Sequence, residues 1–280
     1  MFYNIKQSIK TVLKQGIKVW YGLIGILRSH GIVFSGNARR LLSYRNKYDG
    51  QRCFLVGNGP SLRMEDLQKL NGEVSFACNI IYKVFDKVSW RPTYHFISDV
   101  VAVHAINEEG MLDKVLERPL FSNKDVYEKI KRIKYPGEQV IYLNRINQQK
   151  YRVSRNPLAY YVPAQATVMT LMIEMAVFMG FQEIYLLGVD CTNTFTAGHF
   201  EKSYTGKSVD EYNLEWVRKK TNRPNLTLYE LGEERRLRSL DAYRKLKEYA
   251  DRKQVKIYNA TRGGALEIFE RVDFDTVASK

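Results

Sequence analysis

The sequence has few cysteines, no long apolar run and none of the usual spaced zinc motifs. Its three cysteines, Cys53, Cys78 and Cys191, are too few for a disulfide framework, and an odd number cannot all pair. This cysteine content favours a reducing cytosol. No stretch of about 18 uncharged apolar residues occurs, so no membrane-spanning helix is predicted. The motifs C-x-x-C and H-E-x-x-H are absent, so no zinc site is predicted.

Positive charge is in excess over the whole chain. The 280 residues include 44 Lys and Arg against 30 Asp and Glu, a formal charge of +14. Hydrophobic residues make up 45% and charged residues 26%, which excludes collagen-like, low-complexity and wholly disordered chains. The positive surplus favours an anionic partner, whether nucleic acid, anionic lipid or a phosphorylated substrate.

Residues 1–49 form a basic arm with nine Lys and Arg and a single acid, Asp49. Lys6, Lys10, Lys14 and Lys18 form one stripe beside apolar residues at roughly helical spacing. These apolar residues are Ile5, Ile9, Val12, Ile17, Trp20, Ile24 and Leu27. The pattern is typical of a helix on an anionic membrane surface. The alternative is a helix packed on its own domain, or on a second copy in a homo-oligomer, with solvated lysines.

Two other interpretations of this arm are disfavoured. The apolar stretch at residues 19–27 is too short to span a bilayer and lacks a cleavage site of small residues, so a signal peptide is not predicted. The aromatic side chains do not alternate with basic ones as in a stacking platform, so nucleic acid is not an expected partner.

Residues 50–280 alternate apolar runs with helical patterns. We predict strands at 53–57, 74–79, 93–98, 139–144, 183–190 and 255–260, a long apolar helix at 166–181 and a charged helix at about 233–253. The alternation predicts an α/β domain with a mostly parallel, Rossmann-like sheet covered by helices on both faces. In such sheets ligands bind beyond the carboxyl ends of the strands. The polar segment from about 192 to 231 has little periodicity and is predicted to be a lid over the site.

The turn Gly57-Asn58-Gly59-Pro60-Ser61 directly follows the first predicted strand. Glycines allow the backbone to approach a ligand closely, and amides at the start of a following helix can hold a phosphate. We therefore predict nucleotide contacts from Gly57, Asn58, Gly59 and Ser61. The sequence is neither G-x-G-x-x-G nor a Walker loop. A tight turn without a ligand is the alternative.

Polar residues also follow the other strands. Asn79 ends the second one, Ser98-Asp99 follows the third, and Gly188-Val189-Asp190 follows the central one. An amide there can bind a base edge or a sugar hydroxyl, and a carboxylate can bind ribose, hold a metal or orient an acceptor hydroxyl. A turn asparagine and helix-capping aspartates are the alternatives.

The remaining candidates lie later in the chain. His199, on the predicted lid, can act as a general base near neutral pH, or it is an exposed loop histidine. After the last strand, Asn259, Thr261, Gly263 and the neighbouring Gly264 permit close backbone contact with a ligand, and Arg262 faces a phosphate or solvent. Asp273 and Asp275 imitate a D-x-D metal motif but follow no strand, so no metal site is predicted.

Together these residues resemble a known group of proteins. The segments CFLVGNGPSL, FACN and MGFQEIYLLGVD resemble the bacterial sialyltransferases of glycosyltransferase family 42. They resemble more closely the 6-hydroxymethylpterin diphosphokinase-like family, which includes the central domain of the motility accessory factors. The segments HFEKSYTG and KIYNATRGGALEIFERVD match the latter family. The resemblance covers roughly residues 52–276.

The resemblance implies a GT-A variant fold with a lid, a CMP-linked donor and inverting transfer without a metal. By position, Asn58, Ser61 and Asn79 would contact the cytidine nucleotide, Thr167 would lie in the donor site, and His199 would be the base. The two tyrosines that assist phosphate departure in the sialyltransferases are missing after Asp190. Tyr204 is the candidate substitute, and we expect Asp190 in the catalytic site.

We expect a glycosyltransferase of bacterial surface glycan synthesis that transfers a sugar, such as sialic or another nonulosonic acid, to a glycan or a lipid-linked acceptor. It would be cytoplasmic, held peripherally at the inner face of the plasma membrane, and would need no cofactor. Two alternatives remain open. One is pyrophosphate transfer from ATP to a hydroxymethylpterin, with Mg²⁺ held by Asp99 and Asp190. The other is a non-catalytic protein that binds anionic ligands.

Overall fold

The computed structural model describes residues 15–16, 19–79, 81–133, 139–146, 151–159, 162–163, 166–193, 195, 198, 200 and 207–278. Eight of the described strands form one sheet, and two short strands, β6 and β7, form a separate parallel pair. The strands in chain order are β1 (Arg52–Val56), β2 (Ser75–Cys78), β3 (Tyr94–Ile97), β4 (Leu120–Asn123), β5 (Val140–Leu143), β6 (Arg145–Ile146), β7 (Val162–Pro163), β8 (Glu183–Leu187), β9 (Lys256–Asn259) and β10 (Glu270–Arg271).

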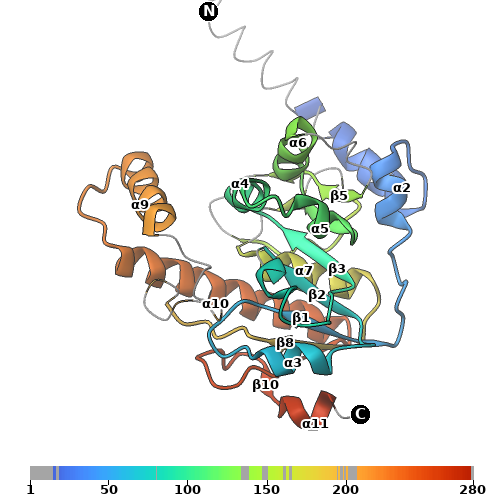
Figure 1. The fold of residues 1–280 in the computed structure, drawn as a ribbon. Coiled ribbons are helices and arrows are strands. Elements are labelled where there is room, and N and C mark those ends of the chain that lie inside the picture. The colour runs from blue at the N-terminus through green and yellow to red at the C-terminus, as the bar shows by residue number, and fades with distance from the viewer. Residues whose placement is uncertain are drawn as a thin grey trace, which may run out of the picture.

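The large sheet has the order β10-β9-β8-β1-β2-β3-β4-β5, and all of its neighbouring strands pair in parallel (Figure 1). Leu55 of β1 lies beside Phe76 of β2 on one side and beside Leu186 of β8 on the other. From β1 the chain proceeds outward through β2 to β5, and from β8 it proceeds in the opposite direction through β9 to β10. The sheet therefore reverses its direction of winding between β1 and β8.

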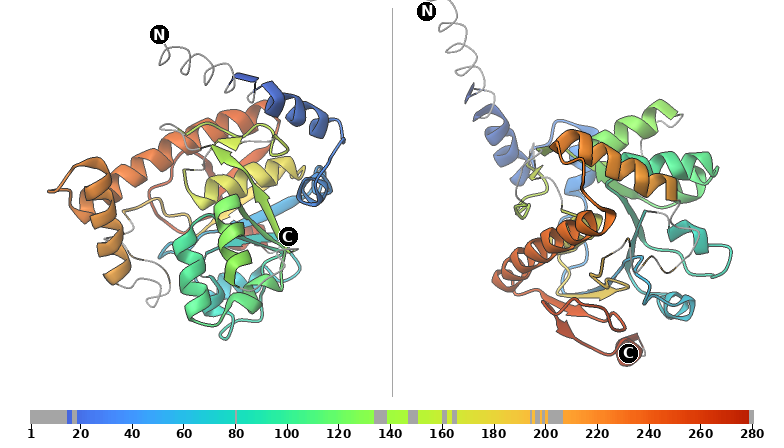
Figure 2. Two further views of the ribbon diagram at one scale, coloured as in Figure 1. Left: turned by 90° about the horizontal axis from the view of Figure 1, so that it is seen from above. Right: turned by 90° about the vertical axis from the view of Figure 1, so that its left-hand side faces the viewer.

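Helices cover both faces of this sheet (Figures 1 and 2). The helices are α2 (Gly36–Leu42), α3 (Met64–Lys69), α4 (Val100–Glu108), α5 (Leu112–Leu116), α6 (Lys124–Ile133), α7 (Val168–Phe178), α9 (Lys207–Thr221), α10 (Leu228–Arg252) and α11 (Phe274–Ala278), with a 3-10 turn at Ile81–Val84. Alternate side chains of each strand point to opposite faces, so Cys53 and Leu55 pack toward α7 and α10. Phe54 and Val56 pack toward α3 to α6 and α11.

Helix α7 is the most apolar helix of the fold, and residues 169–177 are all buried. A helix that is hydrophobic on all sides needs cover on all sides, and α7 lies between the sheet and α10. Thr167 caps its start in a reciprocal pair with Thr170. Helix α7 leads into the parallel strand β8, so it runs opposite to the strands and its first turn lies at the edge where the strands end.

The predicted α/β class and parallel sheet are confirmed. All six predicted strands are present, with ends shifted by up to three residues, and β4 is an additional strand between β3 and β5. Residues 192–231 have little periodicity, yet part of this segment is helical, and its role as a lid stays a prediction. Helix α9 lies within it, and α10 begins at Leu228 rather than at Glu233. Helix α9 was missed because it packs mainly through Leu214 against a small cluster with Leu226 and Leu231, so its apolar pattern is weak.

The end of the basic arm packs on the sheet domain. Leu41 of α2 is buried in the core, and the Asn37 side chain hydrogen-bonds the backbone of Tyr142 in β5 in both directions. The amides of Asn46 and Tyr48 donate to the carbonyls of Phe178 and Met179 at the end of α7. The predicted boundary at residue 49 stays a prediction. The stripe of four lysines, Lys6 to Lys18, lies outside the described residues.

Candidate functional site

The candidate site lies where the sheet reverses its winding, beyond the carboxyl ends of β1 and β8. At such a point the connections leave in opposite directions and open a crevice between the loops. The turn after β1 contains Gly57, Asn58 and Gly59, and the turn after β8 contains Gly188 and Asp190. All five residues line one cavity of about 710 Å³. A cavity of this size suits a nucleotide-sized ligand.

The two turns contact each other through their backbones. The amides of Gly57 and Gly59 donate to the carbonyls of Leu187 and Gly188 over 2.8 and 2.9 Å. A Cβ atom on Gly57 would lie 2.5 Å from the Gly188 oxygen, and one on Gly59 would lie 1.8 Å from the Asp190 carboxylate. Both positions therefore require glycine because of tight packing inside the protein, and not only because of an approaching ligand.

Asp190 is held among these glycines and is only 7% exposed. The Ser61 hydroxyl donates to its Oδ2 over 2.9 Å, and the Ala265 amide donates to its backbone oxygen over 2.7 Å. Burial raises the pKa of Asp190, and the hydrogen bonds from Ser61 oppose this shift. Ser61 thus lies behind the carboxylate and does not itself line the cavity. Asp190 remains a predicted catalytic residue that is fixed in position.

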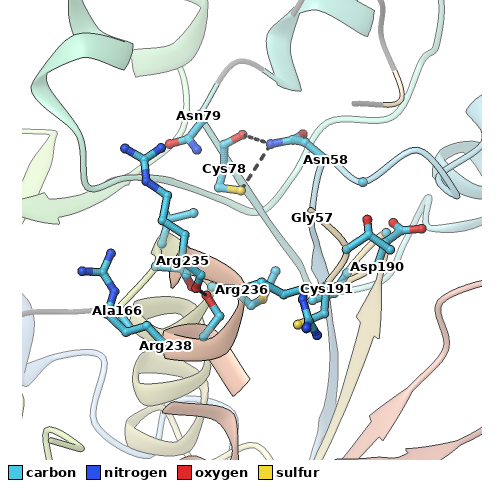
Figure 3. Close-up of a pocket in the computed structure, with 18 of the residues that line it drawn as sticks. Gly57, Asn58, Cys78, Asn79, Ala166, Asp190, Cys191, Arg235, Arg236 and Arg238 are labelled. Atoms are coloured by element: carbon cyan, nitrogen blue, oxygen red, sulfur yellow. Dashed lines mark hydrogen bonds between the residues drawn. The ribbon is translucent and has the colours of Figure 1, made fainter. Parts of the chain in front are cut away.

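Asn58 and Asn79 follow β1 and β2 and both line the cavity, with Cys78 between them in Figure 3. The Asn58 amide nitrogen donates to the Cys78 carbonyl over 3.2 Å. Asn79 adopts a left-handed conformation with φ of 52°, which asparagine tolerates better than most residues. Its backbone oxygen accepts a hydrogen bond from His95 Nε2 over 2.7 Å, and burial lowers the pKa of His95 to about 4, so this histidine is neutral.

The side-chain oxygen of Asn79 is buried and has no hydrogen-bond partner among the described residues. An unpaired buried acceptor costs about 1–3 kcal/mol of stability. Because Asn79 lines the cavity, a bound ligand can provide the missing donor. This oxygen is the clearest sign of a ligand in the cavity.

Three further predicted residues line the same cavity, namely Ser98, Asp99 and Thr167. Asp99 caps α4 by accepting a hydrogen bond from the Val101 amide over 2.9 Å. The alternative role given above for Asp99, a helix-capping aspartate, is therefore present. Thr167 caps α7 through its contact with Thr170. Both residues therefore hold helix starts at the cavity, and any contact with a ligand is additional to that role.

The group predicted after β9 does not line the cavity. Asn259 is fully buried and donates to the Leu266 carbonyl over 2.7 Å, while its oxygen accepts the Thr261 amide. The Thr261 hydroxyl accepts the Val189 amide over 3.0 Å. Gly263 has a φ of 77° and turns the chain so that Gly264 can contact Asp190. These residues support the loop after β8, and direct donor contacts from them stay a prediction.

Arg262 pairs with Asp275 of the D-x-D motif and with Asp66. Arg262 donates to both oxygens of the buried Asp66 and to both oxygens of Asp275. Asp273 accepts the Thr276 amide at the start of α11. Arg262 therefore faces carboxylates rather than a phosphate or solvent. Within the described part of the chain, no group of three His, Cys, Asp or Glu side chains is placed to hold a metal ion.

The two predicted residues His199 and Tyr204 lie outside the described residues. The described residues that flank His199 in the sequence are Gly198 and Phe200. Gly198 lines the cavity, and the Phe200 amide donates to the Asn58 carbonyl over 3.2 Å. Phe200 therefore lies close to the turn after β1.

Sequence reasoning missed the positive wall of the cavity, which is formed by Arg235, Arg236 and Arg238 of α10 with Arg145 of β6. In Figure 3 the three α10 arginines extend from the helix into the cavity. Arg236 pairs with Glu233, and Arg145 pairs with Asp125. The three α10 arginines fall within the charged helix predicted at about 233–253, to which no role in the site was assigned. The signal available in the sequence was the cluster of arginines three to six residues after Gly232, the position where α10 meets Asn193.

The start of α7 adds to this positive wall. Ala166, Thr167, Val168 and Met169 all line the cavity, and the first amides of a helix have no partners within it. The helix dipole makes this end partly positive, and it favours anions. The cavity therefore combines neutral polar side chains, Asn58 and Asn79, with positive groups from α7 and α10, and Arg235 extends toward Asn79 in Figure 3.

Comparison with known proteins supports the fold and the family. The fold is similar to that of the MAf glycosyltransferase from Magnetospirillum magneticum AMB-1, with a TM-score of 0.52 and 18% sequence identity. The match covers 83% of this chain and 35% of that one, so this chain spans about a third of its neighbour's length. A search of curated proteins finds no match. The family model described as 6-hydroxymethylpterin diphosphokinase MptE-like matches residues 31–196, more than half of the chain, and the protein therefore belongs to this MptE-like family.

Proposed function

We propose that the protein is a glycosyltransferase that binds a nucleotide-linked sugar in the cavity between β1 and β8. The observation that carries this proposal is the polarity of the cavity. The cavity is lined by a buried Asn79 oxygen that has no hydrogen-bond partner among the described residues, and also by three α10 arginines and the start of α7. A nucleotide has this complementary character, because its base and ribose supply hydrogen-bond donors and its phosphate supplies negative charge.

In this proposal each group of residues in the cavity has its own role. Asn79 accepts a hydrogen bond from the base or ribose, and the glycine turn at residues 57–59 lets that part of the ligand approach the backbone. The arginines and the first amides of α7 stabilise the phosphate as it leaves with extra negative charge. His199 takes the proton of the acceptor hydroxyl. Asp190, fixed by Ser61, orients the groups between donor and acceptor.

The donor class is CMP-linked in this proposal, with a sialic or other nonulosonic acid as the sugar and a glycan or lipid-linked acceptor. Support comes from the sequence resemblance to the sialyltransferases and from the MAf glycosyltransferase fold. The cytosine amino group is a suitable donor for the Asn79 oxygen. Transfer needs no resident metal here, because the positive wall supplies the charge that stabilises the leaving phosphate.

A ligand screen tests the proposal directly. The melting temperature should rise with CMP or CDP more than with UDP, GDP or ATP, since a ligand that binds only the native state stabilises it. Arg235→Gln should weaken nucleotide binding about tenfold or more, because a charge-assisted hydrogen bond contributes about 1.5–3 kcal/mol. Arg244→Gln is the matched control, since Arg244 is exposed on the same helix and does not line the cavity. If no nucleotide raises the melting temperature, the proposal fails.

His199 is tested separately. His199→Ala should lower turnover strongly and leave nucleotide binding largely intact, because a general base acts on the acceptor. Unchanged turnover would remove His199 from the mechanism.

The second candidate is diphosphokinase chemistry, which the description of the family favours. Asp99 and Asp190 are the carboxylates that line the cavity, and they are the residues that would hold Mg²⁺ in that reaction. Activity that survives EDTA would argue against the kinase. Strict dependence on Mg²⁺, together with a preference for ATP in the ligand screen, would favour it over glycosyl transfer.

A further inference from the structure

Residues 19–34 carry a concentration of exposed apolar side chains that the cavity does not explain. Among the described residues, the large apolar side chains that are exposed include Val19, Trp20, Leu23, Ile26, Leu27, Ile32 and Phe34, and only four others lie elsewhere in the chain. Single exposed apolar residues are normal on proteins, whereas a contiguous group of them marks an interaction surface.

The exposed residues share one face of a helix. Residues 19–29 are helical, and positions 19, 20, 23, 26 and 27 recur at intervals of one, three and four residues that keep them on one side of the helix. Ile32 and Phe34 follow just after the helix, and Phe34 is 75% exposed. We call these seven residues the apolar face of the arm.

The opposite side of this helix is attached to the domain. Gly25 is buried, and Ser29 accepts hydrogen bonds from Asn156 and from Arg45, each over 2.7 Å. The helix is thus held in place with its apolar face turned outward, at the periphery of the molecule (Figure 2). Ile24, which the sequence pattern placed with Trp20 and Leu27, is only partly exposed and lies between the two sides.

Charge decides which partner suits this face. The first 49 residues carry nine basic side chains and one acid, with Arg28, Arg39, Arg40, Arg45 and Lys47 between residues 19 and 49. A second copy bound through this face would bring two such basic segments together, because a two-fold interface pairs the same patch on both subunits. Like charges that face each other oppose association. An anionic surface has the complementary charge.

We propose that the apolar face of the arm inserts into the surface of an anionic lipid bilayer. Trp20, which is 62% exposed, suits the boundary between headgroups and acyl chains, where tryptophan is enriched. The basic residues of the arm add attraction to anionic headgroups. No helix in the described part of the chain has the length and hydropathy to cross a bilayer. The arm lies on the membrane in this arrangement.

This proposal is separate from the proposed function, because none of residues 19–49 lines the cavity. Substitutions in the apolar face should therefore change membrane binding without changing nucleotide binding. The failure of one proposal can be distinguished from the failure of the other.

The test measures binding of the full chain to vesicles. The protein should sediment with vesicles of equal parts phosphatidylglycerol and phosphatidylcholine, and much less with phosphatidylcholine alone or at high salt. Ile26→Gln should weaken the partitioning about tenfold, since the isoleucine side chain no longer leaves water. Leu237→Gln on α10 is the matched control, because Ile26 and Leu237 are both 57% exposed. Neither substitution touches the core.

A second measurement locates the contact. In a Trp216→Phe variant, Trp20 is the remaining exposed tryptophan, since Trp90 is buried. Brominated lipids should quench its fluorescence and shift its emission to shorter wavelength. Absence of vesicle binding, or equal binding by Ile26→Gln and wild type, would overturn the proposal. A wild-type dimer that Ile26→Gln converts to a monomer would also overturn it, because the face would then bind a second copy.

Discussion

Two adjacent glycines provide a quantitative test of how Asp190 is held. Gly263 and Gly264 have φ values of 77° and 75°, so alanine at either position pays the same left-handed penalty of about 1–2 kcal/mol. Both substitutions also gain about 0.4–1 kcal/mol from a less flexible unfolded chain. These two contributions cancel when the variants are compared with each other.

The surroundings of the two glycines differ. A Cβ on Gly263 has no heavy atom within 4 Å, whereas a Cβ on Gly264 would lie 2.7 Å from both the Cα and the backbone oxygen of Asp190. Backbone cannot rotate away as a side chain can, and overpacking of this kind costs about 1–3 kcal/mol. Gly264→Ala should therefore be about 1–3 kcal/mol less stable than Gly263→Ala.

Urea unfolding of the two variants and of wild type measures this difference through the transition midpoints at equal slope. Nucleotide binding by Gly264→Ala should also weaken, because Asp190 and the turn after β8 must move to admit the methyl group. Equal losses of stability in the two variants would refute the proposed packing of Gly264 against Asp190.

Three further predictions concern groups near the site and in the core. Burial raises the pKa of Glu174 to about 8, so the folded protein keeps a proton that the unfolded chain releases, and the free energy of unfolding should fall as the pH rises from about 4.5 to 8. In urea unfolding at several pH values, Glu174→Gln should flatten this fall, and an unchanged slope would contradict the assignment. Arg262→Ala should lower the free energy of unfolding by about 3 kcal/mol, because it leaves the buried Asp66 carboxylate without its main cation, and a loss below about 1 kcal/mol would show the pair to be solvated. Burial also raises the pKa of Cys191 to about 11, so iodoacetamide should alkylate it at pH 7.5 far more slowly than in the denatured chain, as peptide mass spectrometry would show; equal rates would count against this burial.

Local sequence predicted most of the sheet. A short apolar run followed by glycine or by a polar residue predicted β1, β2, β3 and β8, because the side chains of a buried parallel strand face apolar layers on both sides. Strand β4 (Leu120–Asn123) was not predicted in this way, although it lies between β3 and β5 and pairs with both. Its two apolar residues are followed by Ser122 and Asn123, which are buried because they hydrogen-bond the carbonyls of Ile97 and Ser98.

The candidate site was only half predictable. The turns after β1, β2 and β8 follow strands directly, so their convergence could be expected from the geometry of a parallel sheet. The arginines of α10 could not be assigned in the same way, because a charged helix has solvent on most of its circumference. Only packing against α7 determines which of its side chains face the cavity.

The sequence by itself determined the class of the fold, the polar turns at the strand ends and the basic character of the arm, since these depend on residue order and on composition. The tertiary structure alone decided the roles of distant residues. It placed Ser61, Thr261 and Gly264 against the loop of Asp190 and paired Arg262 with Asp66. Among the described residues it also left the apolar face of the arm exposed. The physical reason is that such contacts join segments far apart in the chain, and their partners follow from the order of the strands, which no local pattern contains.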